Sequence, residues 1–200
     1  TAGGAIGGSP LANDAEEYHA EMLRHFPGAI CKPGDGTAVA SLRAAGAVIM
    51  GKTVTAEYAY YHPGKTRNPH DPDRTPGGSS SGSAAAVADG MVPVALGTQT
   101  GGSVIRPASY CGVFGFKPSH GSISRHGVLK QSRTLDHVGM FARSIDDLAL
   151  LARPLFVADG KDTDVRPDVR LDLVEHWALE PIERPRIAFV KSPVWEHATP

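Results

Sequence analysis

The sequence predicts an α/β fold in which a mixed β-sheet is flanked by helices. Short apolar runs of strand length alternate along the chain with segments of helical character, which is the pattern of an α/β protein. The chain has 200 residues, of which 41% are hydrophobic and 20% are charged. That composition is typical of a globular protein with a buried core and excludes a disordered chain.

Four helices are expected from apolar periodicity and from capping residues. Thr37 is expected to cap the second helix, and Gly46 is expected to end it. The third helix consists of very small residues, which permit close packing against a sheet. Ser144 is expected to cap the fourth. The expected ranges are 14–26, 38–45, 83–89 and 146–152.

Three strands are expected between and after these helices. Residues 47–50 are all apolar, so this strand is expected to be buried on both faces. Pro93 lies near the start of the second strand, which indicates a strand start or an edge. Residues 154–185 are expected to form an irregular connection before the last strand. The expected strands are 47–50, 92–96 and 186–191.

Charge and composition restrict the partners that the protein can have. Lys and Arg number 20 against 21 Asp and Glu, a net charge of −1, which argues against binding to nucleic acid or to a membrane surface. Two cysteines and the absence of a signal peptide favour the cytoplasm. No metal-ligand spacing is present, so no metal and no other cofactor is expected.

Two familiar motifs occur in the sequence without the elements that they need. Residues 46–53, GAVIMGKT, fit a phosphate-binding loop, but a helix is expected before them and the loop positions are apolar strand formers. A nucleotide site would require that this segment be an open loop. Residues 78–82 fit a nucleophile elbow centred on Ser80, but no strand is expected before them. The first motif is therefore interpreted as a strand followed by a turn, and the second is not interpreted as the elbow of an α/β-hydrolase.

A third signal is a pair of glycine-serine turns. Residues 77–80 open the expected helix 83–89, and residues 101–103 follow the strand 92–96. Glycines leave backbone N–H groups free to converge on one point, as an oxyanion hole requires, and a helix N-terminus favours negative charge. The alternative is that serine and glycine are simply turn residues.

The segments around these turns are similar to those of the amidase signature family. The resemblance extends from about residue 37 to residue 151, whereas residues 13–32 do not match. It implies that residues 1–200 form a single, partial amidase signature domain with an α/β fold. The matching segments are 51–58, 67–72, 76–88, 96–108 and 110–118.

The resemblance also implies a chemistry, because the family hydrolyses or transfers carboxylic amides through a Ser–cis-Ser–Lys triad. Carried over by position, Ser103 is the nucleophile and Ser79 is the bridging serine, held in a cis peptide, that relays the proton. Backbone amides would form the oxyanion hole, and three further side chains would support the loops or the substrate. The amides are those of Thr100, Gly101, Gly102 and Ser103, and the side chains are Ser80, Gln99 and Arg106.

The triad lysine is the part of the family pattern that does not carry over. In the family it lies shortly before a T-A-G segment, and this chain begins with Thr1, Ala2 and Gly3, so a fragment truncated at both ends is expected. Lys52 belongs to the G-K-T turn and is not assigned to the role. The resemblance implies that the complete protein hydrolyses amides through a Ser103 acyl-enzyme. The alternative is a truncated, catalytically silent homologue that binds carboxamides or small anions. The particular amide, the acyl acceptor and the oligomeric state are not predicted.

Overall fold

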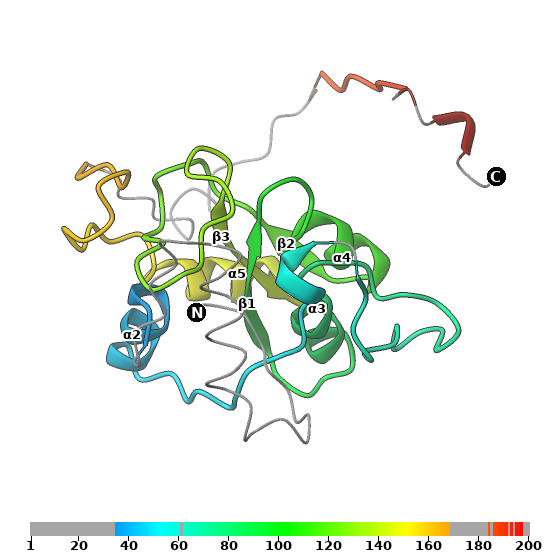
Figure 1. Cartoon of the computed structure of the whole chain (residues 1–200), viewed down its shortest axis with the longest axis horizontal. Coiled ribbons are helices and arrows are strands. Elements are labelled where there is room, and N and C mark those ends of the chain that lie inside the picture. The colour runs from blue at the N-terminus through cyan, green and yellow to red at the C-terminus, as the bar shows by residue number, and fades with distance from the viewer. Residues whose placement is uncertain are drawn as a thin grey trace.

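The computed structural model describes residues 35–60, 62–168, 184, 186–191, 193 and 195–197. The helix expected over 14–26 and the divergent segment 13–32 lie outside these residues. Helices and strands follow one another as the α/β class requires (Figure 1). In chain order the elements are α2 (Thr37–Ala44), η2 (Glu57–Ala59), α3 (Ser81–Ala88), β1 (Val94–Gln99), α4 (Ile105–Tyr110), β2 (Phe114–Phe116), β3 (His137–Ala142), α5 (Ile145–Ala152) and η3 (Trp195–His197).

The described strands form one sheet in the order β1-β3-β2, and both pairings are antiparallel. Met140 of the central strand pairs with Leu96 on one side and with Phe116 on the other. Residues 138–142 are all buried because β3 has a neighbour on each edge and helices on both faces. The predicted fold class, a sheet flanked by helices, is confirmed.

The two faces of β3 belong to two separate hydrophobic cores, as the alternation of side chains along a strand requires. Met140 and its same-face neighbours pack with α2 and α5, for example with Leu42 and Leu148. Phe141 points the other way and packs with α3 and α4, for example with Val87. Figure 1 shows α2 and the pair α3–α4 on opposite sides of the sheet. The serine-bearing segments are therefore held against the second face.

Three of the expected helices are confirmed, with small shifts at their ends. The Ser144 hydroxyl accepts the N–H of Asp147 at 3.0 Å, as a cap of α5. The expected cap of α2 is wrong, because Gly36 is the N-cap and the Thr37 hydroxyl donates instead to Asp159 at 2.5 Å. The small residues of α3 allow the expected close packing, with Ala84 completely buried.

Two of the expected strands are wrong. Residues 47–50 have no regular structure, and Val48 and Met50 are 82% and 75% exposed. Residues 186–191 form no strand either, and Ile187 is exposed. An apolar run becomes a strand only where another strand pairs with its backbone, and no named strand among the described residues pairs with these. The strand expected over 92–96 is present as Val94–Gln99 and begins directly after Pro93, as a strand start should.

The described helices are short, eight residues at most. Within the described part of the chain, none of them is long and apolar enough to span a bilayer.

Candidate active site

Two glycine-serine loops meet at the same end of β1. Ser79 lies just before Ser80, the N-cap of α3, and follows a cis peptide bond from Gly78. Ser103 lies in the turn between β1 and α4. The N–H of Ser80 donates to the carbonyl of Ser103 at 3.3 Å, which joins the two loops directly. The carbonyl of Ser79 accepts the N–H of Ala56 at 2.9 Å, so a third segment holds the first loop from the outside.

The serines that follow Ser79 attach α3 to β1. The Ser80 hydroxyl donates to the carbonyl of Thr98 at 3.1 Å and accepts the N–H of the same residue at 3.2 Å. The Ser83 hydroxyl donates to the carbonyl of Leu96 at 2.7 Å. Ser80 is 1% exposed and both of its hydrogen-bonding functions are used, which is incompatible with an exposed nucleophile at an elbow.

The Gln99 carboxamide organises the loop that carries Ser103. Its Oε1 accepts the N–H groups of Val104 and Ile105 at 2.8 and 3.0 Å, and its Nε2 donates to the carbonyl of Gly101 at 3.2 Å. The first N–H groups of a helix have no partner within the helix, so this buried side chain satisfies the start of α4. Gln99 thereby shapes the loop from within.

Arg106 closes the same loop on its outer side. Its backbone N–H donates to the carbonyl of Gly102 at 2.9 Å. A Cβ atom at position 102 would lie 2.8 Å from the Arg106 Nη2, so a glycine is needed for the guanidinium to approach this closely. The Arg106 side chain is exposed to solvent.

A small pocket of about 20 Å³ lies beside Ser79. Ser79 itself is only 3% exposed. No lysine is among the described residues that line this pocket. Lys52, from the G-K-T turn, lines a separate open groove with Met91. The main polar residues of the pocket wall are Ser79, Thr98, Thr100, Arg125, Gln131, Asp136 and His137.

His137 is held in this wall by its own backbone neighbourhood. Its Nδ1 lies 2.6 Å from the carbonyl of Leu135. Burial and the positive charge of Lys117 lower the pKa of His137 below its ordinary value, so the ring is neutral at neutral pH.

Asp136 is a second member of the wall that sequence reasoning did not identify. It is 6% exposed, and its Oδ1 accepts the Thr100 hydroxyl at 2.5 Å. Its Oδ2 accepts the N–H groups of Gln131 and Ser132 at 2.6 and 2.9 Å. The only signal in the sequence is an acidic residue directly before a strand that was itself not predicted.

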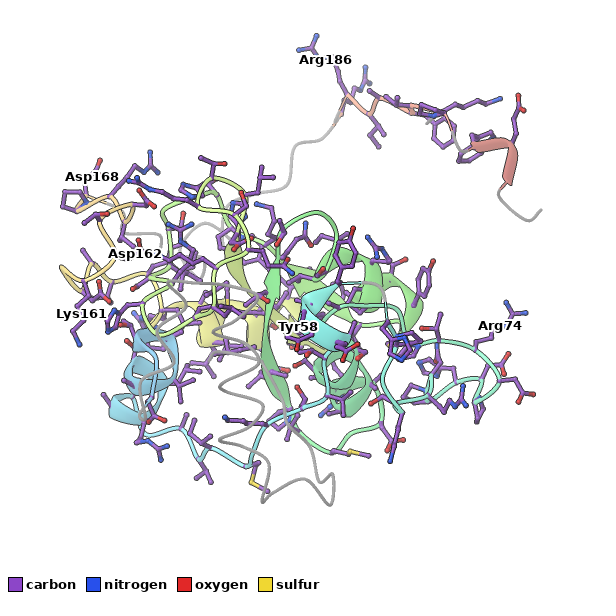
Figure 2. All side chains as sticks on the ribbon, in the orientation of Figure 1. Tyr58, Arg74, Lys161, Asp162, Asp168 and Arg186 are labelled. Carbon is purple, nitrogen blue, oxygen red and sulfur yellow. The ribbon has the colours of Figure 1, made fainter. Side chains whose placement is uncertain are left out.

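Arg125 was also missed, and it ties the pocket to the segment after α5. Its side chain is 2% exposed and bonds to Asp162 and Asp164 at 3.0 and 2.5 Å. Asp162, which is labelled in Figure 2, lies in the loop that Arg125 anchors. Burial alone would raise the pKa of Asp162. The hydrogen bonds from Arg125, the backbone N–H of Asp164 and the charge of Arg125 together outweigh burial and hold that pKa below its ordinary value. A buried ion pair of this kind forms only when distant segments meet.

The phosphate-loop motif at 46–53 has neither of the elements that its chemistry needs. The segment is open and exposed, which meets one requirement of a nucleotide site, and it is not a strand, so the expectation of a strand there is wrong. It is preceded by α2, and the next described helix, η2, begins only at Glu57. A phosphate-binding loop follows a strand and leads directly into the N-terminus of a helix. This segment follows a helix, and no helix begins directly after it. Over the described ranges, no three His, Cys, Asp or Glu side chains gather as metal ligands.

Comparison with known protein families gives one match over most of the chain. Residues 25–200 match the family model described as Amidase. Among curated relatives, a glutamyl-tRNA(Gln) amidotransferase subunit from Treponema pallidum is 54% identical over 136 residues, which is 65% of this chain and 26% of the relative. The corresponding subunit from Clostridium botulinum is 40% identical over 202 residues, which is 94% of this chain and 41% of the relative.

Solved structures agree with these matches. The structure of 6-aminohexanoate cyclic dimer hydrolase is similar with a TM-score of 0.69 and 38% identity, over 75% of this chain and 33% of that one. The chain thus spans about a quarter to two fifths of the length of the curated relatives that it matches.

Proposed function

The chain belongs to the amidase signature family, and from that premise we propose that the protein cleaves the C–N bond of a carboxylic amide through an acyl-enzyme on Ser103. In this proposal Ser79 relays the proton. The backbone amides of Thr100, Gly101, Gly102 and Ser103 form the oxyanion hole.

The proposed reaction conserves atoms and charge through two steps. The Ser103 Oγ attacks the amide carbon while its proton passes to the Ser79 Oγ, whose own proton passes to a base. The carbonyl oxygen becomes an oxyanion and accepts hydrogen bonds from the loop amides. When the tetrahedral intermediate collapses, the C–N bond breaks and the leaving amine takes a proton from Ser79. Water then hydrolyses the Ser103 ester by the reverse relay.

The observation that carries the proposal is the hydrogen bond from the Ser80 N–H to the Ser103 carbonyl, at 3.3 Å. It places the backbone of the nucleophile loop against the loop of the proposed relay. Gln99 and Arg106 support the proposal because their N–H groups bond the carbonyls of Gly101 and Gly102, in the loop whose own N–H groups must point to one place. For Ser80, we propose a supporting role through its two bonds to Thr98.

One observation favours the second candidate, a catalytically silent homologue that binds carboxamides or small anions. The pocket beside Ser79 has no lysine among the described residues that line it, and the family chemistry uses a lysine as its base. A serine hydroxyl is a poor nucleophile without a base. The same loop amides would then bind a carbonyl or an anion without acylation.

The test is to treat the chain with a serine-directed fluorophosphonate and to locate any adduct by peptide mass spectrometry. We expect an adduct at Ser103, none in Ser103→Ala, and slower labelling in Ser79→Ala. The matched control is Ser109→Ala, an exposed serine on α4 outside both loops, which should label as wild type does. Absence of labelling in a sample that is folded by circular dichroism would refute the acyl-enzyme and leave the silent homologue.

The substrate class proposed here is a small-molecule amide in the cytoplasm, with neither nucleic acid nor membrane as a partner. The relatives' names include both an amidotransferase and a hydrolase of a cyclic dimer. Adding ammonia or hydroxylamine as competing acceptors and measuring the partition of the acyl group would distinguish transfer from hydrolysis.

A further inference from the structure

We propose that Asp136 is a positioning residue that holds the oxyanion loop in place through the Thr100 hydroxyl. This inference rests on the proposed function only for the identity of the loop as an oxyanion hole. The contacts that carry it belong to the fold itself.

The Asp136 carboxylate is a fixed anchor. Its Oδ2 accepts two backbone N–H groups, from Gln131 and Ser132, which set the plane of the carboxylate. Asp136 directly precedes His137, the first residue of the central strand β3. Because the carboxylate is 6% exposed and its second oxygen is occupied, its Oδ1 is held at one position. Hydrogen bonds to an ionised acceptor are shorter and stronger than neutral ones.

Thr100 is the residue of the loop that this anchor reaches. Its hydroxyl donates to Asp136 Oδ1 at 2.5 Å and lies 3.1 Å from the Gln131 Oε1. Gly101 and Gly102, which follow, have no side chains by which the protein could hold them. Thr100 is therefore the point at which a side-chain contact from outside fixes the first half of the loop.

The second half of the loop is already fixed by another side chain. Gln99 holds the N–H groups of Val104 and Ile105, at the start of α4. With Thr100 tied to Asp136, the residues in between are restrained at both ends. Without the Asp136 contact, the Thr100 hydroxyl would keep only the exposed Gln131 side chain as a partner, and the rest of the loop would depend on Gln99.

Through Gln131, the Asp136 carboxylate is also connected to a third segment of the chain. The Gln131 side chain, which lies beside the Thr100 hydroxyl, donates through its Nε2 to the carbonyl of Tyr58. The oxyanion loop is therefore tied through Asp136 and Gln131 to the chain that precedes the first glycine-serine loop.

The size of the expected effect follows from what such a loop does. Loss of one oxyanion donor lowers a rate by about 10²–10³-fold, and misplacement by about 1 Å costs roughly 10²-fold. A positioning residue should cost less than a donor, because the amides are still present. We expect a fall of roughly 10- to 100-fold in the rate of Ser103 labelling when Asp136 is changed, an order of magnitude taken from those values.

The experiment is a double-variant cycle on the chain. The variants are Asp136→Asn, Thr100→Val and the two together. Thr100→Val keeps the shape of the side chain and removes only the hydroxyl, and Thr100→Ser restores that hydroxyl. The matched control is Asp146→Asn, an exposed carboxylate in the first turn of α5. Two quantities are measured for each: the rate of fluorophosphonate labelling at Ser103, and hydrogen–deuterium exchange of the amides of residues 100–103.

The proposal expects both single variants to label more slowly and to exchange faster over 100–103. The double variant should lose no more than the worse single variant, and Thr100→Ser should recover most of the loss. Asp146→Asn should match wild type in both measurements. A structural role of Asp136 elsewhere would slow labelling in Asp136→Asn but not in Thr100→Val, or would make the two losses multiply, and either result overturns the proposal.

Failure of the proposed function gives a different pattern. If wild-type Ser103 is not labelled at all, the acyl-enzyme is refuted, and the exchange measurement alone then decides the role of Asp136. Faster exchange over 100–103 in Asp136→Asn and Thr100→Val, and not in Asp146→Asn, supports the anchor. Unchanged exchange overturns it.

Discussion

Replacing Arg125 by methionine removes the cation from a buried ion pair while keeping a side chain of similar length. Arg125 is 2% exposed, and the Asp162 carboxylate beside it is 1% exposed. The guanidinium reaches both oxygens of Asp162, at 3.0 and 3.3 Å. The Lys130 Nζ, at 3.7 Å from Asp162, is beyond hydrogen-bond distance and its side chain is 39% exposed. In the variant, Asp162 keeps backbone bonds but loses the main charge that compensates its burial, so we expect a large loss of stability.

The magnitude follows from the cost of leaving one charge of a buried pair unpaired, which is about 3–5 kcal/mol. For a chain of 150–250 residues, 1 kcal/mol corresponds to roughly 2–4 °C in Tm, so the expected decrease is roughly 6–20 °C. Urea denaturation followed by circular dichroism, with Tm as a second measurement, checks this value.

The same reasoning predicts how the loss depends on pH. In wild type the pKa of Asp162 lies below its ordinary value, so this carboxylate stabilises the fold above that value and stops doing so as pH falls through its folded pKa. In Arg125→Met burial without the guanidinium raises the pKa of Asp162. The deficit relative to wild type is therefore full above the raised pKa of the variant. It begins to shrink as pH falls through that raised pKa and continues to shrink below about 4, the ordinary pKa of an aspartate, as wild type loses its own stabilisation.

Arg133→Met is the matched control, because Arg133 also pairs with Asp164 but is 74% exposed. Exposed ion pairs contribute little, so this variant should unfold as wild type does. If Arg125→Met and Arg133→Met unfold alike, or if the Arg125→Met deficit does not narrow in acid, the reasoning from burial is refuted.

Three further predictions follow from single contacts. Gln99→Leu leaves the buried N–H of Val104 without an acceptor and should cost about 1–3 kcal/mol in urea unfolding; an unchanged unfolding free energy would contradict this. Burial raises the pKa of Cys111 to about 11, so its thiol should resist iodoacetamide at about pH 8 until urea unfolds the chain, and rapid native labelling would contradict it. Gly77 and Gly90 both have φ +76°, but only at Gly77 would a Cβ meet backbone, 2.9 Å from the Cα of Pro107; Gly77→Ala should therefore lower Tm well below that of Gly90→Ala, and equal Tm values would count against it.

The helices show what local sequence is able to predict. The helices α2, α3 and α5 lie within two residues of the ranges expected from local sequence, because helix signals act within one or two turns of the chain. Ser144 caps α5 as expected, because its partner Asp147 is three residues away. The expected cap by Thr37 is wrong because a tertiary partner, Asp159, takes that hydroxyl.

The strands show where local sequence is insufficient. Residues 47–50 have the composition of a buried strand, yet their side chains are exposed and no described strand lies beside them. Residues 137–142 were not predicted, although they form the central strand. A strand depends on hydrogen bonds to a neighbour that is distant in the chain, and composition does not say whether that neighbour is present.

By itself, the sequence determined the fold class, the helices α2, α3 and α5, and the family, since the glycine-serine segments at 76–88 and 96–108 are specific; it did not predict α4. Only the tertiary structure decided that Asp136 reaches Thr100 and that Arg125 pairs with Asp162, contacts that span 36 and 37 positions of the chain. The physical reason is the separation along the chain of the residues that interact. Caps and turns are set by neighbours along the chain, whereas a buried carboxylate acquires a partner only when the segments that carry them pack together.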